Sequence, residues 1–279
     1  PIRRFPGGSE RTVNETMAIR KIAVLTSGGD APGMNAGIRA VVRTALSKGV
    51  ECFGVYRGYN GLINGDLVPM NLRSVSDIIH RGGTMLYTAR SPEFCTEAGM
   101  QKAVETCRKN EIDGVVVIGG DGSFRGAQDL TRHGLTGAGI PCVCIPGTID
   151  NDVASSEYTV GFDTAMNTAV DMVDRLRDTT ESHDRCSVVE VMGRRAGYLA
   201  LNVGIAVGAT SIIVPEVPFD FERDIIDRMR TTSATGKKHF IVIVAEGVGH
   251  VMSMAEDIEK RLGIETRATI LGHVQRGGN

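Results

Sequence analysis

The sequence predicts an α/β protein with two Rossmann-like, mostly parallel sheets. Apolar runs of strand length alternate with amphipathic helical patterns, the apolar runs are continuous, and many of the 35 glycines stand where such runs end. Continuous apolar strands that alternate with helices are typical of parallel sheets covered by helices on both faces. About ten strands are expected, which is enough for two sheets of ordinary size.

The first half of the chain shows this alternation from about Ile19 onward, after a polar stretch at 1–16 that we expect to be a flexible extension. One expected helix carries its apolar residues on a single stripe that includes Met34, Ile38 and Val42. Strands are expected at 21–26, 52–56, 114–120 and 141–145, and helices at about 34–48, 99–110 and 122–132.

The second half repeats the same alternation. The segment "SSEYTVG" near 155–162 interrupts the apolar pattern, so we predict two domains, at 17–160 and 161–279. In the second domain, strands are expected at 186–191, 211–216, 240–247 and from 268, and helices at about 164–178, 196–206, 222–231 and 251–262.

Composition excludes several classes of function. The 31 basic and 33 acidic residues give no global positive field for nucleic acid or an anionic membrane. The sequence has no apolar run of about 18 residues and no apolar core in its first residues, so we expect neither a membrane span nor a signal peptide, and a cytoplasmic location. The six cysteines lack CxxC spacing, which favours reduced thiols over disulfides or zinc ligands.

Acidic turns follow three of the expected strands, in "LTSGGDAPGMN", "VVIGGDGS" and "IPGTIDND". Ligands of open α/β sheets bind at the carboxyl ends of strands, and a Gly-rich turn before a helix can hold phosphate with its backbone N–H groups. Asp30 and Asp121 have an alternative role as helix caps. The turns do not match the usual dinucleotide fingerprint or a Walker A loop.

A nucleoside triphosphate on these turns would need a divalent cation, and Asp121 is the best candidate to hold Mg²⁺. Asp150 follows an adjacent strand and is the candidate general base for the acceptor hydroxyl. We expect Thr148, Asp150 and Asp152 to point the same way, because alternate residues of an extended segment share a face. The alternative is a loop held together by Asx turns.

Charge on a transferred phosphoryl group is well matched by the planar donors of Arg. Each candidate Arg has the alternative of being a solvated surface residue. His273 could bind an anion or pack on the sheet, and Glu246 could accept from a sugar hydroxyl or cap the next helix. The arginines that stand near strand or loop ends are Arg90, Arg185, Arg194, Arg267 and Arg276.

Six motifs in order, "LTSGGDAPGMN", "GGDGS", "PGTIDND", "VMGR", "AEG" and "LGHVQRGG", closely resemble the bacterial-type, ATP-dependent phosphofructokinase family from about Lys21 to Gly278. The resemblance implies transfer of the γ-phosphoryl group of ATP to the 1-hydroxyl of fructose 6-phosphate, Mg²⁺ dependence and a homotetramer. It also implies that residues 17–160 bind ATP and Mg²⁺, and that residues 161–279 bind the sugar phosphate and return at their end toward the first domain.

The same resemblance assigns roles to matching positions. Asp150 would be the base, Asp121 the Mg²⁺ residue, and Arg90 and Arg194 would stabilise the migrating phosphoryl group together with Thr148. The nucleotide contacts would be Gly29, Arg90, Ser91, Gly120, Asp121, Gly122 and Ser123. The sugar-phosphate contacts would be Thr148, Ile149, Asp150, Met192, Gly193, Arg194, Glu246 and Arg276, with His273, Arg185 and Arg267 on the 6-phosphate and the last two supplied by a neighbouring subunit.

Departures from the family also carry expectations. The family's chains usually continue some tens of residues past "QRGG", and "LTGAG" at 135–139 resembles a small surface insertion. Thr210 stands where an acidic residue of the family binds an activator's metal, which argues against a nucleotide activator. The basic residues that match the family's effector site are Arg39, Arg43, Arg177, Lys237, Lys238 and His239.

Alternatives to the kinase remain open at this point. Pyrophosphate-using relatives typically carry Asp and Lys where this chain has Gly122 and Gly147, and the two glycines should leave space for adenosine. Pyrophosphate-dependent transfer is therefore the nearest alternative. A non-catalytic nucleotide-binding regulatory subunit and an NAD-binding oxidoreductase are the others.

Overall fold

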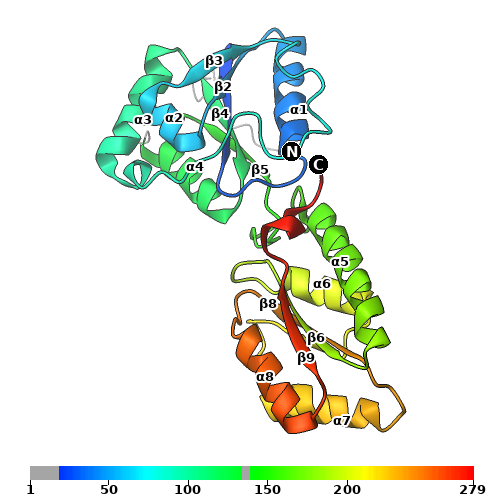
Figure 1. Cartoon of the computed structure of the whole chain (residues 1–279). Coiled ribbons are helices and arrows are strands. Elements are labelled where there is room, and N and C mark those ends of the chain that lie inside the picture. The colour runs from blue at the N-terminus through cyan, green and yellow to red at the C-terminus, as the bar shows by residue number, and fades with distance from the viewer. Residues whose placement is uncertain (1–18, 134–138) are drawn as a thin grey trace, which may run out of the picture.

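The computed structural model describes residues 19–133 and 139–279, and its first sheet has five strands in the order β3-β2-β1-β4-β5 (Figure 1). All neighbours are parallel except β3, which runs antiparallel to β2. The predicted extension at 1–16 and most of the predicted insertion at 135–139 lie outside the described residues. The strands are β1 (Lys21–Ser27), β2 (Glu51–Val55), β3 (Leu67–Met70), β4 (Gly114–Gly119) and β5 (Cys142–Pro146).

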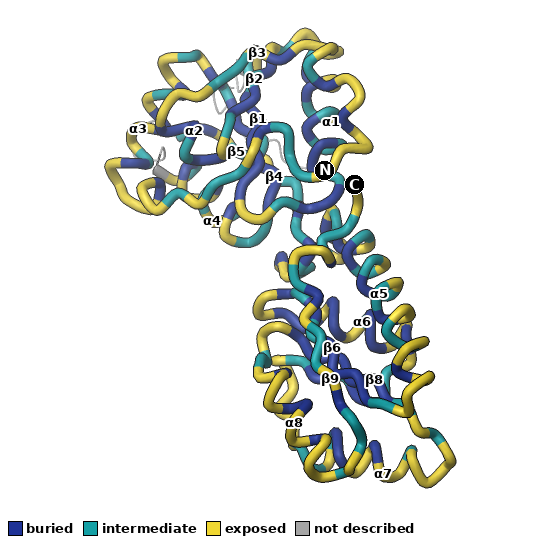
Figure 2. The backbone as a smooth tube through the Cα atoms, viewed as in Figure 1, coloured by how far each residue is buried: buried dark blue, intermediate teal, exposed yellow. Residues whose placement is uncertain are grey.

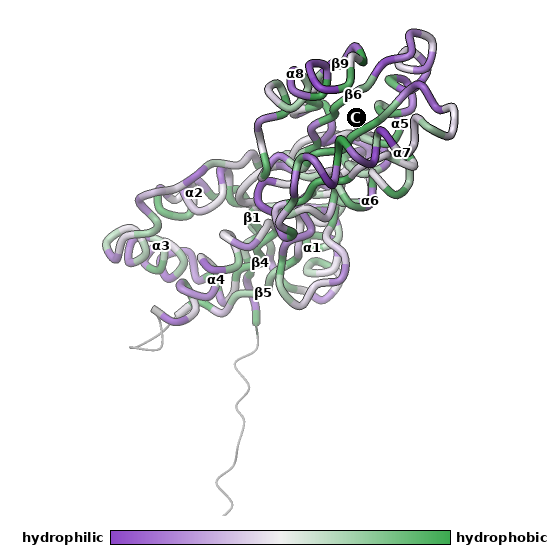
Figure 3. The backbone as a smooth tube through the Cα atoms, turned by 90° about the horizontal axis from the view of Figure 1, so that it is seen from below, coloured by the Kyte–Doolittle hydropathy of each residue, from purple (hydrophilic) through white to green (hydrophobic). Residues whose placement is uncertain are grey.

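Helices cover both faces of this sheet. On one face, Met34 and Ile38 of α1 pack with Val24 and Ile118 of the strands, and on the other face Leu62, Val104 and Leu130 of α2, α3 and α4 form a second core. Figure 3 draws β4 and β5 in hydrophobic green, and β4, in the interior of the sheet, is buried along nearly all of its length. The helices are α1 (Met34–Ser47), α2 (Gly58–Asn64), the 3₁₀ turn η1 (Glu93–Cys95), α3 (Glu97–Lys109) and α4 (Asp121–His133).

The second sheet has four parallel strands in the order β7-β8-β6-β9. Its central strands β6 and β8 are buried between α7 and α8 on one face and α5 and α6 on the other, whereas the outer helices and the edge strand β9 carry exposed residues (Figure 2). The elements are α5 (Phe162–Ser182), β6 (Cys186–Val191), α6 (Tyr198–Ala206), β7 (Ser211–Ile213), the π-helical turn η3 (Glu222–Ile226), α7 (Asp227–Ser233), β8 (Phe240–Ala245), α8 (Val251–Leu262), β9 (Thr266–Ile270) and the 3₁₀ turn η4 (Gly272–Arg276).

The predicted class, an α/β protein with two mostly parallel sheets, is confirmed. The α-helix α2 and the strand β3 were missed, because "GYNGLIN" has two glycines and β3 has only four residues. The 3₁₀ turns η1 and η4 were not expected either. The strand expected at 211–216 ends at Ile213, just before Val214 and Pro215, and proline cannot donate a ladder hydrogen bond. The domain boundary after residue 160 stays a prediction.

The carboxyl ends of the strands in the two sheets face each other. Phe162, at the start of α5, packs into the α1 core of the first sheet. The last residues run from β9 back to the first sheet (Figure 1), where the Asn279 side-chain amide donates to the His80 carbonyl oxygen at 2.8 Å. The loops that follow both sets of strands therefore lie in one region.

Candidate active site

The first sheet has its topological switch point between β1 and β4, which are neighbours although the chain leaves them in opposite directions. The turns at 27–30 and 119–121 follow these strands. A Cβ atom on Gly119 would lie 2.5 Å from the Ser27 carbonyl oxygen and 2.6 Å from the Ser123 hydroxyl oxygen. Only glycine lets the two turns approach this closely.

The predicted nucleotide contacts surround this switch point. Nothing lies within 4 Å of a Cβ atom built on Gly29 or Gly122, so both backbones border open space. Asp121 is the first residue of α4, and its carboxylate oxygen Oδ2 lies 2.9 Å from an Arg125 guanidinium nitrogen. Ser123 is buried, and its carbonyl oxygen accepts from the Tyr59 hydroxyl at 2.7 Å.

Asp30 does not cap α1, so that alternative is wrong. The N-cap is Gly33, and α1 has no side-chain cap. The Asp30 carboxylate instead lies 3.2 Å from Arg276 Nε in η4. This ion pair joins the turn after β1 to the last described turn of the chain.

Arg90 and Ser91 come to the same region on the loop after β3. The Thr88 hydroxyl donates to the Gly28 carbonyl oxygen at 2.6 Å, and the Thr26 hydroxyl donates to the Tyr87 carbonyl oxygen at 2.8 Å. The Ser91 hydroxyl donates to Asn60 Oδ1 at 2.9 Å, whereas the Arg90 side chain is exposed. Hydrogen bonds to β1 and its turn therefore place both residues beside the Gly-rich turns.

Asp150 lies on the loop after β5, but not on an extended segment. The strand ends at Pro146, the chain bends, and Asn151 has a left-handed φ of 54°. The expected reason for a shared face, alternation along an extended segment, is therefore wrong, because a left-handed residue breaks the two-residue period. That Thr148, Asp150 and Asp152 point the same way stays a prediction. A local bond of the kind that the alternative expects is made by Thr148, whose hydroxyl oxygen accepts from the Asp150 N–H at 3.2 Å, and a longer-range bond joins the Thr159 N–H to Asn151 Oδ1 at 2.9 Å.

Burial raises the pKa of Asp150 to about 6, and the negative charges of Asp152 and Glu246 act in the same direction. The positive charge of Arg194 opposes them. Asp150 follows a strand of the first sheet, whereas Glu246 and Arg194 follow β8 and β6 of the second. The half-buried carboxyl thus lies where the two sets of strand ends meet, a setting typical of a general base.

Arg194 and Glu246 are held together by the backbone. Gly193 has a φ of 139° and Arg194 a φ of 56°, so the chain turns sharply after β6. The Arg194 N–H donates to Glu246 Oε2 at 3.0 Å, and the Met192 N–H donates to Gln275 Oε1 at 2.7 Å. The capping role for Glu246 is wrong, because His250 is the N-cap of α8 and makes no side-chain cap.

The predicted sugar-phosphate contacts that follow strands lie in this region, including Arg276 in η4 and Thr148, whose methyl and hydroxyl groups lie beside Gly120. Ile149 is buried and His273 is exposed on η4. Gln275, also in η4, is fully buried, and its amide nitrogen has no hydrogen-bond partner within the described residues.

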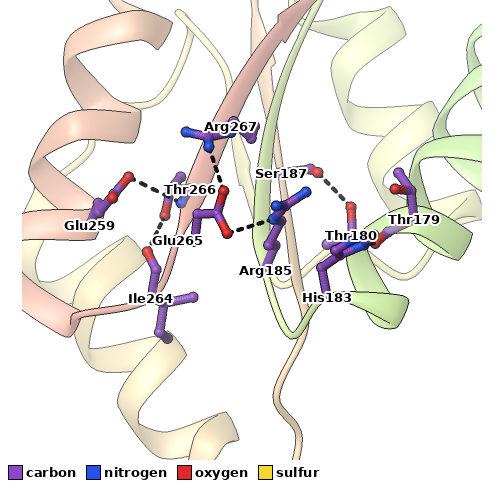
Figure 4. Close-up of polar contacts among 10 residues, drawn as sticks. All are labelled: Thr179, Thr180, His183, Arg185, Ser187, Glu259, Ile264, Glu265, Thr266 and Arg267. Carbon is purple, nitrogen blue, oxygen red and sulfur yellow. Dashed lines mark hydrogen bonds and ion pairs between the residues drawn. The ribbon is translucent and has the colours of Figure 1, made fainter.

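Arg185 and Arg267 lie at the end of the second sheet that is opposite to the candidate site. They stand at the amino ends of β6 and β9, and Glu265 contacts both guanidinium groups (Figure 4), with Arg185 Nε at 2.8 Å. Arg185 lowers the pKa of Glu265. Within one chain these two arginines therefore do not lie near Asp150, because the length of the strands separates the amino ends from the carboxyl ends.

The predicted effector residues also fall into separate places. Arg39 and Arg43 are on α1, against the first sheet. The others belong to the second sheet: Arg177 on α5 donates to the Val207 carbonyl oxygen, and Lys238 Nζ lies 3.9 Å from Asp184 Oδ2. Lys237 and His239 flank Lys238 just before β8.

The two glycines that distinguish phosphoryl donors differ in their surroundings. Gly122 borders open space, as expected. A Cβ atom on Gly147, however, would lie 3.0 Å from Ile118 Cγ2 and 3.5 Å from Met34 Cε. The expectation of free space at Gly147 is therefore wrong, since core side chains fill it.

The fit to Mg²⁺ rests on Asp121. No group of three or more His, Cys, Asp or Glu side chains within residues 19–133 and 139–279 is arranged to hold a metal. A single carboxylate at a Gly-rich turn fits Mg²⁺ that arrives with substrate phosphates, because this ion is usually bound by one or two carboxylates plus phosphate and water. Across the same described ranges, no helix is long and apolar enough to cross a membrane.

Sequence reasoning missed Asn151, Thr159 and Gln275, whose side chains hydrogen-bond to the backbone of the candidate site. Asn151 and Gln275 stand inside motifs that had already been singled out, so their polar side chains at strand ends were the available signal. Thr159 lies outside those motifs, and nothing in the linear sequence indicates that it folds back on Thr148.

Comparisons with known proteins agree with this arrangement. The chain is 58% identical over 261 residues to an "ATP-dependent 6-phosphofructokinase" of Brevibacillus brevis, and 54% identical over 261 residues to the protein of that name from Bacillus subtilis. Each match covers 94% of this chain and 80% of the relative.

Solved structures share the fold. A phosphofructokinase from Saccharomyces cerevisiae matches with a TM-score of 0.85 at 38% identity, over 93% of this chain and 39% of that one. A pyrophosphate-dependent phosphofructokinase from Marinobacter aquaeolei matches with a TM-score of 0.81 at 22% identity, over 92% of this chain and 69% of that one, and shows the fold alone. The family model described as phosphofructokinase matches residues 21–279. The chain therefore belongs to the phosphofructokinase family.

Proposed function

We propose that this protein transfers the γ-phosphoryl group of ATP to the 1-hydroxyl of fructose 6-phosphate and so forms fructose 1,6-bisphosphate, the glycolytic reaction, in the cytoplasm. The similarity to proteins named ATP-dependent 6-phosphofructokinase supports this reaction. The observation that carries it is the half-buried Asp150 carboxyl, opposite Arg194 and beside the Gly-rich turns. A base next to a phosphate-binding switch point is what this transfer requires.

Asp150 acts as the general base in this proposal. Burial and the neighbouring carboxylates raise its pKa to about 6, which leaves it ionised at neutral pH yet basic enough to take a hydroxyl proton. The Asp150 carboxylate accepts no hydrogen bond from the described residues, so both of its oxygens are free for the acceptor hydroxyl.

Arg194 and Arg90 supply the positive charge. Arg194 already acts on Asp150 electrostatically, and its backbone is fixed by Glu246. Arg90 approaches from the loop tied to Gly28. The two guanidinium groups stabilise the developing charge of the transferred group, with Thr148 beside the Gly120 turn.

Nucleotide binding falls to the turns at the switch point. Gly29 and Gly122 border open space where their backbones can approach the phosphates, with Gly120, Ser123 and Ser91 nearby. Asp121 would hold Mg²⁺, which when bound neutralises charge on the phosphates of ATP.

Binding of fructose 6-phosphate uses the loops of the second sheet. The proposed contacts in the same chain come from Ile149 and from residues after β6, β8 and β9, which meet Asp150 at the strand ends. They are Met192, Gly193, Glu246, His273 and Arg276.

Arg185 and Arg267 complete the 6-phosphate site only if they come from a second copy. Both lie at the amino ends of their strands, away from Asp150. A homotetramer with shared sites is therefore part of the proposal, and the six basic effector residues on α1, α5 and the turn before β8 would meet across its other contacts. Inactive Arg185→Ala and Asp150→Asn proteins, once mixed and reassembled, should then recover part of the activity.

A donor assay tests the proposed reaction. Formation of fructose 1,6-bisphosphate is measured in a coupled assay with ATP or with pyrophosphate as the donor. Turnover with ATP alone supports the proposal. Turnover with pyrophosphate alone would establish the pyrophosphate-dependent alternative, and no turnover with either donor in the full-length protein would point to a regulatory subunit.

A further inference from the structure

The loop that carries Asp150 has little regular structure but is closed at its base. The Val160 N–H donates to the Pro146 carbonyl oxygen at 2.8 Å, and the Gly147 N–H donates to the Gly119 carbonyl oxygen of β4 at 2.9 Å. Residues 148–159 therefore leave the sheet and return to it. The carboxylate at the centre of this loop needs some other means of being held in place.

The carboxylate itself does not provide that means. Within residues 19–133 and 139–279, the only hydrogen bond of Asp150 is from its N–H to the Thr148 hydroxyl oxygen, at 3.2 Å. A general base must keep its oxygens free for the substrate, so its position has to be set by the backbone on either side of it.

Thr159 and Asn151 tie that backbone down on both sides. Before Asp150, the buried Thr159 hydroxyl donates to the Thr148 carbonyl oxygen at 2.6 Å. After it, Asn151 Oδ1 accepts from the Thr159 N–H at 2.9 Å, and Asn151 Nδ2 donates to the Glu157 carbonyl oxygen at 3.2 Å. Asn151 has a φ of 54°, a conformation that Asn tolerates better than most residues.

We infer that Asn151 and Thr159 are positioning residues, which fix Asp150 at the distance and angle needed to take the proton of the sugar hydroxyl. The inference rests on the proposed phosphoryl transfer. One residue, Thr159, hydrogen-bonds to the chain on both sides of Asp150. Loss of these bonds should therefore change the position of the Asp150 carboxylate relative to the sugar hydroxyl, while the turns that bind the nucleotide keep their own contacts.

The test uses Thr159→Val, Thr159→Ser and Asn151→Gly in the full-length protein. Valine keeps the shape of threonine and removes the hydroxyl, serine keeps the hydroxyl, and glycine keeps the left-handed φ while removing both side-chain bonds. Displacement of a catalytic group by about 1 Å costs about 100-fold in rate. We expect kcat to fall about 10- to 100-fold in Thr159→Val and Asn151→Gly, with the KM for ATP within about threefold, and Thr159→Ser to stay within about threefold of wild type.

Thr180→Val is the matched control. Thr180 lies on α5, outside the Asp150 loop, and is also buried; its hydroxyl bonds the Leu176 carbonyl oxygen and the Ser187 hydroxyl, each at 2.6 Å. A purely structural role predicts a loss of Tm in both Val variants and an unchanged kcat per folded molecule. Positioning predicts a loss of Tm in both but a fall in kcat for Thr159→Val alone.

The double variant Asn151→Gly/Thr159→Val adds a second criterion. Because both residues act on one loop, its kcat should be no more than about threefold below that of the worse single variant. Wild-type kcat in both single variants, or multiplication of the two losses in the double variant, would overturn the inference. An inactive wild type would instead overturn the proposed reaction.

Discussion

Arg276 and Asp30 form an ion pair between the last turn of the chain and the turn that follows its first strand, with Nε 3.2 Å from Oδ2. Asp30 is on the turn beside the proposed nucleotide contacts, and Arg276 is a proposed contact to the sugar phosphate. The pair therefore links the two halves of the proposed site.

Loss of Arg276 should weaken binding of the sugar phosphate. We expect Arg276→Leu to raise the KM for fructose 6-phosphate about 10- to 100-fold, because a hydrogen bond to a charged group contributes about 1.5–3 kcal/mol. The KM for ATP should stay within about threefold. Arg175→Leu, which removes an exposed Arg paired with Asp171, is the control. The measurement is steady-state kinetics with each substrate varied in turn. Equal increases in both KM values would contradict the assignment of Arg276 to the sugar-phosphate site.

The acid side of the pH–rate profile should report Asp150. With a pKa of about 6, Asp150 loses its charge as the pH falls below 6. The value of kcat/KM should therefore decline as a single group is protonated, with an apparent pKa near 6. Asp152 and Glu246 raise this pKa and Arg194 lowers it. Asp152→Asn should therefore move the decline to lower pH, by about 0.3–1 pH unit. A profile that is flat down to pH 5 would contradict this role.

The same pKa has a consequence for stability. A free Asp has a pKa of about 3.9, so the fold favours the protonated form of Asp150, and that contribution is complete below about pH 4 and lost as the pH rises through 6. The ionised group costs up to about 3 kcal/mol at pH 7.5. The free energy of unfolding of Asp150→Asn should therefore be about 1–3 kcal/mol higher than that of wild type at pH 7.5, and nearly equal to it at pH 4.

Denaturant unfolding at the two pH values measures this difference. Because only the two proteins are compared at each pH, titration of other groups largely cancels. A variant that is less stable than wild type at pH 7.5 would show that the Asp150 charge is stabilised, not strained, in the folded protein.

Gly122 and Gly147 should respond differently to the residues of a pyrophosphate-type site. Gly122→Asp has open space and should fold normally, yet raise the KM for ATP at least tenfold, because it adds a negative charge beside the phosphates. Gly147→Lys should lower stability by about 1–3 kcal/mol, because Ile118 and Met34 occupy the space. Thermal unfolding and ATP kinetics test both, with Gly122→Ala as the control that adds volume without charge. Unchanged ATP kinetics in Gly122→Asp would contradict the nucleotide assignment.

Much of this fold was predictable because it depends on local pattern. The continuous apolar run of β8 and the amphipathic stripe of α8 (Val251–Leu262) fix both the element type and the parallel sheet. The short elements α2 and β3 were not predictable, because seven residues with two glycines carry too weak a periodicity.

The site was predictable only in part. The acids after β4 and β5 stand in turns whose position at a strand end follows from topology. The conformation of the Asp150 loop does not follow from alternation, because it depends on Asn151 in a left-handed conformation and on Thr159, eight residues later. Contacts between distant segments, such as Arg276 with Asp30, arise only once both sheets are in place.

The central claim is that Asp150 takes the proton of the sugar hydroxyl. The most direct measurement is single-turnover phosphoryl transfer in wild type and Asp150→Asn, started from enzyme that has been saturated with both substrates. We predict that Asp150→Asn binds ATP and fructose 6-phosphate within a few-fold of wild type but transfers the phosphoryl group about 10²–10⁴ times more slowly. Transfer at the wild-type rate, or a loss of binding as large as the loss of rate, would contradict the claim.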